Sequence, residues 1–383
     1  MNNRLVVAKD EGVEKLLHDA GIEGVYAPNG GSVSQYLADI EAPLQTSSHV
    51  VLTMANDEAG DALADELARR IGVGKCRRVQ WPDEPPVASE GIVALIDDAK
   101  PYPVEGVFSA DDLHDEVYAL WLYGESRGAP TGWDCITKLY TIKPGEWSLV
   151  TGIPGHGKSE FVDALAVNLA MSEGWKTAFY SPENQPLQTH ISKLLQKYTD
   201  RPMETKNLQQ KMSEEQLNKG MSFVNKHFRF ILPSDNHEHT LDSILDLARQ
   251  CVFRDGINCL VLDPWNELEH SRPEKVSETE YISQCLSKIR RFARVNGVHI
   301  WVVAHPTKLS KNRDGIYPCP TPYDVSGSAH WRNKADNCLA VYRPDFTSAR
   351  VDIVVQKIRF KHTGRVGEDF LSYNMFSGRY NEH

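Results

Sequence analysis

Residues 147–159 read WSLVTGIPGHGKS, in which an apolar stretch runs directly into a complete G-x-x-x-x-G-K-[ST] pattern. Apolar side chains then recur with the spacing of one helix face at Phe161, Ala164, Leu165 and Leu169. A strand, a glycine-rich turn and the start of a helix form a phosphate-binding loop (P-loop), because backbone N–H groups and the helix dipole attract phosphate. This stretch therefore predicts an α/β domain that binds a nucleoside triphosphate.

The side chains of this loop have separate predicted roles. Lys158 is expected to reach the β- and γ-phosphates, and the hydroxyl of Ser159 is expected to bind Mg²⁺. The expected cofactors are ATP, or another NTP or dNTP, and Mg²⁺. The predicted nucleotide-binding residues are Gly152, Pro154, Gly155, His156, Gly157, Lys158, Ser159 and Glu160.

Further polar residues follow predicted strands in the same region. One apolar run ends in Asp263, which offers a second magnesium ligand. Glu183 follows a predicted strand over 177–181 that is assumed to neighbour the P-loop strand, so it is the first candidate to activate water. Glu267 is the second candidate. His305 ends another predicted strand and either contacts the γ-phosphate or caps a loop, and its position favours neither interpretation.

Strand-like and helical segments alternate along most of the chain, which predicts two α/β domains. A small parallel domain is expected over residues 1–95, a connector over 96–135 and a larger, doubly wound domain over 136–383. The strands expected in the larger domain are Trp147–Thr151, Thr177–Ser181, Cys259–Asp263, Val298–His305, Cys338–Tyr342 and Val351–Gln356. Those expected in the small domain are Leu5–Val7 and Val50–Thr53.

The connector contains prolines followed by one amphipathic helix. Pro101 and Pro103 exclude regular structure at its start. Ser109 and Asp112 have the spacing of a capping box, and they open a helix with apolar residues on one face. This face packs either on its own domain or on a neighbouring subunit, and the sequence favours neither. The apolar residues are Leu113, Val117, Leu120 and Trp121.

Two segments towards the C-terminus are rich in cations. Residues 308–334 combine basic and aromatic side chains, which suits either a single nucleic-acid strand or a solvated surface loop. Alternation along a strand places Lys357, Arg359 and Lys361 on one face, which is either solvated or supplies a cation to a neighbouring nucleotide site. The residues expected to bind DNA are Lys308, Lys311, Arg332, Asn333 and Lys334, and the rings expected to stack on bases are Tyr317, Tyr323 and Trp331.

Composition limits the class of protein. The chain has 383 residues, 41% hydrophobic and 25% charged, without a run of about 18 apolar residues, so no membrane span is expected. The net charge of −10 does not exclude a nucleic-acid partner, because a basic lining can coexist with an acidic exterior. Seven scattered cysteines and an N-terminus unlike a secretory signal favour a cytoplasmic, phage-encoded or bacterial protein.

Six segments resemble, in order, the motifs of DnaB-like and Twinkle-like replicative helicases: GIPGHGKS, SPEN, VLDPW, AHP, DVSGSAHWRNKADN and QKIRF. The resemblance covers roughly residues 130–380 and implies a RecA-like fold. It makes Glu183 the catalytic glutamate and His305 the γ-phosphate sensor. It also makes Lys357 and Arg359 the cations that reach a neighbour's nucleotide.

The same resemblance implies a hexameric ring that moves along single-stranded DNA and unwinds forked DNA. Residues 326–337 would line the DNA channel, and the helix near 109–123 would dock on the adjacent subunit. A polymerase, a primase and a single-stranded-DNA-binding protein are further expected partners, and no membrane is. The alternative function is a RecA-like ATPase for strand annealing or loading.

The N-terminal region resembles a toprim domain that has lost part of its metal site. That family uses a Glu after its first strand and a D-x-D pair after a later strand to hold Mg²⁺. Here Lys9 takes the place of the Glu, Ala55 replaces the first Asp, and only Asp57 remains. Because a cation beside Lys9 is unfavourable, the resemblance predicts a structural or DNA-contacting domain without primase activity.

Overall fold

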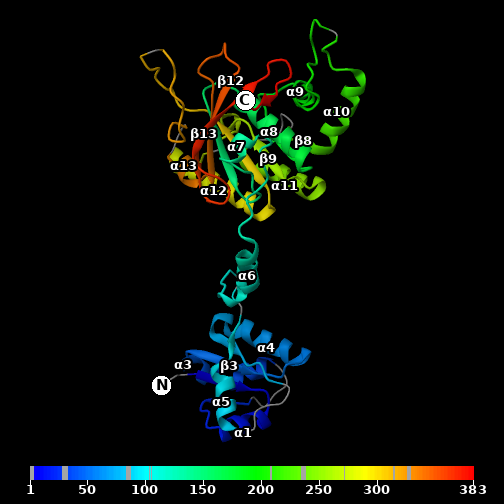
Figure 1. The fold of residues 1–383 in the computed structure, drawn as a ribbon. Helices are drawn as coiled ribbons and strands as arrows, with labels where there is room; N and C mark the ends of the chain where they lie inside the picture. Colours follow the sequence, from blue (N-terminus) through cyan, green and yellow to red (C-terminus); the bar gives the residue numbers. More distant parts are fainter. Residues whose placement is uncertain are drawn as a thin grey trace. The chain divides into compact units, whose positions relative to one another are not determined.

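The computed structural model describes residues 4–27, 33–82, 88–102, 104, 106–207, 209–233, 239–270, 272–313, 315–325 and 329–383. Contacts between residues divide the chain into two compact units, Met1–Gly124 and Glu125–His383. Each unit is built around its own sheet (Figure 1).

The first unit contains a five-stranded sheet with the order β2-β1-β3-β4-β5. Strands β1 to β4 pair in parallel, and β5 pairs antiparallel with β4 at the edge. The strands are β1 (Arg4–Ala8), β2 (Val25–Tyr26), β3 (His49–Thr53), β4 (Cys76–Arg78) and β5 (Lys100–Pro101). The helices are α1 (Glu11–Asp19), α2 (Val33–Asp39), α3 (Glu41–Thr46), α4 (Glu58–Ile71), the 3₁₀ helix η1 (Val73–Lys75) and α5 (Ser89–Asp97). Both strands expected here are confirmed, as is the small parallel α/β fold.

Alternate residues of the central strands face opposite sides of this sheet. Leu5 and Leu52 pack among the side chains of α2 and α4, whereas Val6 and Val51 pack among those of α1 and α5. Burial on both faces is the reason that these strands are continuous apolar runs. Pro101 was expected to exclude regular structure, but it lies in β5, because an edge strand tolerates a residue without an N–H group.

The segment after β5 forms an exposed helix. Ser109 and Asp112 cap each other as predicted: the backbone N–H of Ser109 donates to the Asp112 carboxylate at 2.7 Å, and that of Asp112 donates to the Ser109 hydroxyl at 3.3 Å. The 3₁₀ helix η2 (Asp111–Leu113) leads into α6 (His114–Tyr123). Every residue of α6 is exposed, and Trp121 retains 74% of its accessible surface. The described residues of the first unit therefore do not bury the apolar side chains of α6.

The second unit contains a nine-stranded sheet with the order β14-β13-β12-β11-β6-β10-β9-β7-β8. The strands from β11 to β8 pair in parallel, and β12, β13 and β14 extend the sheet with antiparallel pairing. The strands are β6 (Trp147–Thr151), β7 (Thr177–Tyr180), β8 (Phe228–Phe230), β9 (Cys259–Leu262), β10 (His299–Ala304), β11 (Asn337–Tyr342), β12 (Arg350–Ile358), β13 (Gly367–Tyr373) and β14 (Tyr380–Asn381). All six strands predicted for the larger domain are confirmed.

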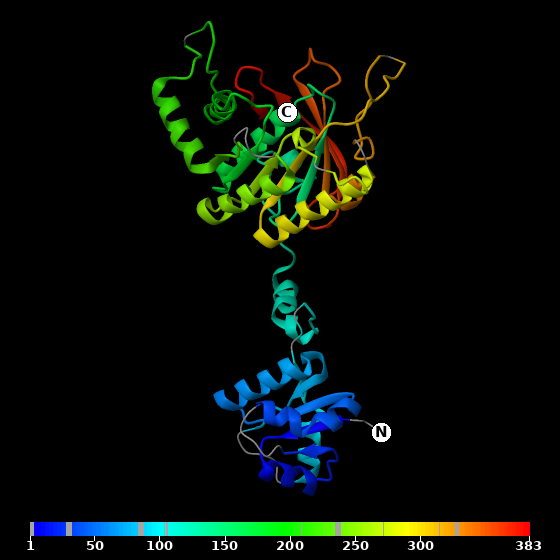
Figure 2. The same cartoon turned by 180° about the vertical axis from the view of Figure 1, so that it is seen from behind.

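Helices cover both faces of the larger sheet (Figure 2). One face packs against α8 (Lys158–Ser172), α9 (Leu187–Thr199) and α10 (Glu214–His227), and the other against α11 (Leu241–Asp255) and α12 (Glu278–Asn296). Shorter helices are α7 (Asp134–Thr137), the 3₁₀ helix η3 (Trp265–Glu267) and α13 (His330–Lys334). This is the predicted doubly wound α/β architecture.

The boundary between the units differs from the expected one. Trp133 and Ile136 are buried in the core of the second unit, so this unit starts at Glu125 rather than at residue 136. The expected connector is therefore shorter than residues 96–135, because both of its ends pack into a unit. No helix among the described residues is both long enough and apolar enough to span a bilayer.

Candidate nucleotide-binding site

Glycines shape the loop between β6 and α8. The backbone of Gly152 has a φ of 156°, and a Cβ atom there would lie 2.4 Å from the carbonyl oxygen of Val341. Gly157 has a φ of 94° and caps the N-terminus of α8. Side chains are strained or excluded at both positions, so the loop closes tightly onto the first turn of α8. Pro154 and Gly155 are exposed at its tip, beside the helix N–H groups that favour an anion.

Lys158, Ser159 and Asp263 come together at the carboxyl edge of the sheet. Lys158 Nζ donates a hydrogen bond to the carbonyl oxygen of Gly152 at 2.9 Å. Burial lowers the pKa of Lys158 to about 8, and the carboxylates of Asp263 and Glu183 oppose this shift. Burial raises the pKa of Asp263 to about 6, against a hydrogen bond from the Ser159 hydroxyl. A hydroxyl beside a buried carboxylate is the oxygen ligand set that Mg²⁺ prefers, so both residues fit the predicted metal site.

Glu183 lies near this site, but for a different reason from the predicted one. Strands β10 and β9 separate β7 from β6, so the assumption that Glu183 follows a neighbour of the P-loop strand is wrong. Strand β7 instead pairs with β9, and the backbone N–H of Asp263 donates to the carbonyl oxygen of Tyr180 at 2.9 Å. The carboxyl ends of β7 and β9 therefore lie side by side, which brings Glu183 to the charges of Asp263 and Lys158.

His305 follows β10 and faces Glu183. Its Nε2 atom lies 3.9 Å from Glu183 Oε1, and its backbone N–H donates to Asn266 Oδ1 at 3.2 Å. Burial and then the Lys158 ammonium lower the pKa of His305, while Glu183 and Glu267 oppose the shift. The Nδ1 atom of His305 has no hydrogen-bond partner among the described residues. Glu183, His305 and Lys158 thus form one electrostatically coupled group. Both candidate bases are exposed, Glu183 after β7 and the second candidate, Glu267, on η3.

Two predicted nucleotide-binding residues direct their side chains into the protein. His156 Nδ1 accepts a hydrogen bond from the backbone N–H of Arg343 at 3.0 Å, and burial lowers the pKa of His156 to about 4. Glu160 forms ion pairs with Lys193 and Lys197 of α9. These side chains fix the loop and α8 to the surrounding structure, so His156 and Glu160 have only backbone groups to offer to phosphate.

Lys193 is a residue that sequence reasoning missed. Its Nζ atom lies 3.2 Å from Glu160 Oε1 and donates a hydrogen bond to Asn184 Oδ1 at 2.9 Å. It joins the helix after the P-loop to the segment that carries Glu183. Lys193 and Lys197 are one helical turn apart on α9, and this spacing was the signal that could have found them.

Lys357 and Arg359 lie at the edge of the sheet opposite to the P-loop of their own chain. Ile358 pairs with Asn337, and Asn337 pairs with Ser148 at the amino end of β6, whereas the P-loop follows the carboxyl end. The five residues of β6, which span roughly 16 Å, therefore separate Lys357 and Arg359 from the P-loop. As alternation predicted, both cations face one side, where they donate to backbone carbonyls at the end of α13. Neither cation can serve its own nucleotide site from this position.

All five residues predicted to bind DNA are at least partly accessible. Lys308, Lys311 and Asn333 are exposed, and Arg332 and Lys334 are partly exposed. Lys311 Nζ lies 5.1 Å from the centre of the Tyr317 ring, so a cation and an aromatic face are presented together. This arrangement suits phosphate and base contacts, and DNA binding by these residues stays a prediction.

Other predicted DNA contacts are placed differently. Lys334 Nζ donates to the carbonyl oxygen of Ser283 on α12 at 2.6 Å, so its charge is held within the chain. Trp331 is fully buried in the core, which makes the expectation that it stacks on bases wrong. Residues 335–337 are also buried and do not line a channel. Residues 326–328 of the predicted channel segment lie outside the described residues.

The toprim-like region uses its remaining acidic residue to cap a helix. Asp57 precedes α4, and its side chain accepts a hydrogen bond from the backbone N–H of Gly60 at 2.7 Å. Within the described ranges, no three or more His, Cys, Asp or Glu side chains are grouped so that they could hold a metal ion. The structure therefore gives Asp57 a structural role.

Known proteins share this combination of fold and motifs. Residues 128–378 match the DnaB-like helicase C-terminal domain. The chain belongs to the DnaB-like helicase family. This DnaB-like chain is 39% identical over 365 residues to the Twinkle homolog protein, chloroplastic/mitochondrial, of Arabidopsis thaliana, with 88% of this chain and 50% of that protein covered. It is 24% identical over 363 residues to a DNA helicase/primase of Enterobacteria phage T3, with 86% and 60% covered.

The DnaB-like chain thus spans about half the length of the curated relatives it matches. Among solved structures it is similar to an isolated ATPase domain, with a TM-score of 0.60, 19% identity, and 72% of this chain and 99% of that chain covered. It is also similar to a structure described as that of a DnaB-like replicative helicase and its interactions with primase, with a TM-score of 0.58, 16% identity, and 85% and 78% covered. At these identities the likeness concerns the fold, and it confirms the expected RecA-like α/β core.

Proposed function

We propose that this chain is an NTP-hydrolysing DNA helicase that assembles into a homohexameric ring, moves along single-stranded DNA and unwinds forked DNA. The position of Lys357 and Arg359 carries the proposal, because cations at the edge opposite their own P-loop cannot reach the nucleotide of their own subunit but are available to that of a neighbouring subunit. Membership of the DnaB-like helicase family supports the same assignment.

Within one subunit, the residues at the carboxyl edge of the sheet bind and orient the triphosphate. Lys158 offsets the charge of the β- and γ-phosphates. Ser159 and Asp263 hold Mg²⁺, which supplies positive charge to the phosphate oxygens. Glu183 orients the attacking water and accepts its proton. His305 contacts Glu183 and responds to the loss of the γ-phosphate.

The adjacent subunit completes each site. Lys357 and Arg359 approach the γ-phosphate from outside and stabilise the charge that develops in the transition state. Trans-acting arginines increase kcat by about 10³- to 10⁵-fold in other P-loop enzymes. The exposed apolar residues of α6 are covered by a neighbouring subunit, because burial of such a surface favours association.

The loops after β10 and around α13 contact the DNA strand. Lys308, Lys311 and Arg332 bind phosphates, and Asn333 adds a polar contact. The first unit has no primase activity, because Lys9 occupies the position of a metal-binding Glu. A polymerase, a primase and a single-stranded-DNA-binding protein are the replication proteins that we expect to meet this ring, in a phage-infected or bacterial cytoplasm.

Strand separation on a forked duplex tests the proposal. The wild-type chain with NTP and Mg²⁺ is expected to unwind the fork, and Lys158→Ala, which removes the P-loop ammonium, is expected to be inactive. Annealing of complementary strands without any unwinding would assign the chain to strand annealing or loading instead. Primer synthesis that survives Lys158→Ala but is lost in Asp57→Ala would overturn the absence of primase activity.

A further inference from the structure

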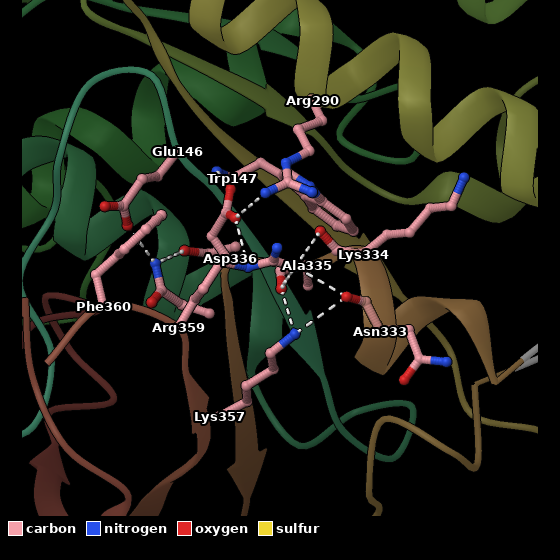
Figure 3. Close-up of polar contacts among 12 residues, drawn as sticks. Glu146, Trp147, Arg290, Asn333, Lys334, Ala335, Asp336, Lys357, Arg359 and Phe360 are labelled. Carbon is pink, nitrogen blue, oxygen red and sulfur yellow. Dashed lines mark hydrogen bonds and ion pairs between the residues drawn. The ribbon is translucent and has the colours of Figure 1, made fainter. Parts of the chain in front are cut away.

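A buried carboxylate lies next to the cations that we assign to the neighbouring nucleotide (Figure 3). Asp336 is 1% exposed and connects α13 to β11. Its Oδ1 atom lies 3.0 Å from Arg359 Nε and 3.5 Å from Arg290 Nη2. Its Oδ2 atom accepts a hydrogen bond from the backbone N–H of Trp147 at 3.2 Å. One side chain therefore joins α13, α12, the start of β6 and the end of β12.

Charge rather than hydrogen-bond geometry holds the guanidiniums at Asp336. Neither contact of Oδ1 is aligned as a hydrogen bond, so Oδ1 and the Nε atom of Arg359 are paired by attraction alone. An isolated carboxylate at this depth is strongly unfavourable, and loss of one partner from a buried ion pair is correspondingly costly. Asp336 therefore constrains where the Arg359 side chain lies.

The opposite side of Arg359 is held by the end of α13. Its Nη2 atom donates to the carbonyl oxygens of Asn333 at 2.8 Å and Lys334 at 3.2 Å, and Lys357 Nζ donates to that of Ala335 at 2.6 Å. The last carbonyls of a helix lack partners within the helix and carry partial negative charge, so cations stabilise them. Arg359 is thus clamped between a buried carboxylate and the helix that carries three of the predicted DNA contacts.

We propose that Asp336 is a positioning residue that holds Arg359 against α13, so that the cation offered to the neighbouring nucleotide moves with the predicted DNA contacts Arg332 and Asn333. The inference rests on the proposed function, since it needs Arg359 to act in trans. Asp336 would then couple the DNA contacts of one subunit to NTP hydrolysis in the next subunit.

The first test is Asp336→Asn, which keeps an oxygen for the Trp147 N–H but removes the charge that fixes Arg359. In the presence of single-stranded DNA, kcat is expected to fall about tenfold or more with KM for NTP nearly unchanged, because misplacement of about 1 Å at a catalytic group can cost about 100-fold. Asp352→Asn is the matched control, because Asp352 pairs with Arg350 on the same strand but away from this cluster. It is expected to turn over like wild type.

A double-mutant cycle separates positioning from general damage. If Asp336 acts through Arg359, then Asp336→Asn adds no further loss of kcat in an Arg359→Ala background. Full additivity of the two losses would overturn the proposal.

Mixed subunits provide a readout that a merely structural role would not change. Asp336→Asn retains an intact P-loop, and Lys158→Ala retains an intact Arg359, so their mixture is expected to hydrolyse NTP faster than the two proteins do separately. Arg359→Ala mixed with Lys158→Ala is the reference mixture. If the reference mixture gains activity and the mixture with Asp336→Asn does not, the role of Asp336 is overturned and the proposed function stands. If neither mixture gains activity, the shared nucleotide site fails and this inference fails with it.

Asp336→Glu keeps the inference testable if Asp336→Asn does not fold. The longer carboxylate retains the charge but displaces the guanidinium by one methylene, so a folded protein with lower kcat is expected. A folded Asp336→Glu with wild-type kcat and DNA stimulation would overturn the proposal.

Discussion

Glu183 Oε1 lies 3.9 Å from His305 Nε2, although the strands that precede these residues, β7 and β10, are separated in the sheet by β9. The contact is made by the loops beyond the strand ends, where the carboxyl ends of parallel strands meet at one edge. It joins the proposed base for hydrolysis to the residue proposed to respond to the γ-phosphate. Both residues influence the charge state of the P-loop site, because each is electrostatically coupled to Lys158.

Glu183→Gln tests which carboxylate activates water. The amide cannot accept a proton, so kcat is expected to fall by about 10²- to 10⁴-fold while nucleotide affinity is retained. Steady-state hydrolysis and equilibrium nucleotide binding measure the two effects separately. Glu267→Gln is the matched control, because Glu267 is likewise exposed, on η3. A larger loss of kcat in this variant than in Glu183→Gln would make Glu267 the residue that activates water.

Lys308→Ala combined with Lys311→Ala tests the predicted DNA contacts. Each phosphate contact to single-stranded DNA adds about 0.7 to the slope of log affinity against log salt, so the slope is expected to become shallower by about 1.4. Titration of labelled single-stranded DNA at several salt concentrations measures it. Lys219→Ala removes another exposed cation, on α10, and should leave the slope unchanged. Equal slopes for the double variant and wild type would remove these two lysines from the DNA interface.

Trp121→Ser tests whether the exposed helix α6 joins subunits. A buried tryptophan contributes about 150–250 Å² of contact surface, so its loss is expected to weaken the oligomer without lowering the stability of either folded unit. Sedimentation over a range of protein concentrations measures the assembly. Phe253→Ser is a comparable control, since Phe253 is 79% exposed on α11. An oligomer that persists unchanged in Trp121→Ser would contradict docking through this residue.

His299 is expected to make part of the free energy of unfolding depend on pH. It is the buried first residue of β10, its Nδ1 atom lies 2.9 Å from the carbonyl oxygen of Lys143, and burial lowers its pKa from 6.5 to about 4. The unfolded chain therefore binds a proton that the folded chain does not, and this contribution is complete above pH 6.5 and lost as the pH falls towards 4. Its size is about 3 kcal/mol for a shift of about 2.5 pH units.

Urea unfolding of wild type and His299→Gln at pH 7 and pH 4 measures this component. The variant cannot titrate at this position, so the advantage of wild type in unfolding free energy is expected to shrink by about 3 kcal/mol at the lower pH. An advantage that is the same at both values would show that His299 titrates normally in the fold.

Short-range patterns predicted the strands and the P-loop because they depend on neighbouring residues. The apolar run 147–151 and the glycines after it specify a buried strand and a tight turn wherever the strand lies in the sheet. Strand order is different, since it depends on pairing between distant segments. For this reason the position of Glu183 in sequence suggested a P-loop neighbour, and the structure instead places β9 and β10 between them.

Side-chain partners were also beyond the sequence patterns. The sequence cannot show whether Lys334 faces a DNA strand or the carbonyl oxygen of Ser283. Its partner depends on how the chain packs in three dimensions. Trp331 lies within a basic, aromatic segment, yet its ring is buried in the core of the second unit. Asp336 carries no local signal, because its partners Arg290 and Arg359 come from other elements.

A nucleotide site shared between subunits is the central feature of the proposed ring, and NTP hydrolysis by Arg359→Ala, alone and mixed with Lys158→Ala, tests it most directly. Single-stranded DNA is expected to stimulate wild type, while Arg359→Ala binds nucleotide and DNA but hydrolyses about 10³-fold more slowly. Mixing the two inactive variants is expected to restore hydrolysis, because an intact P-loop then meets an intact arginine. Wild-type turnover by Arg359→Ala, without any effect of DNA, would contradict the shared site and the ring helicase built on it.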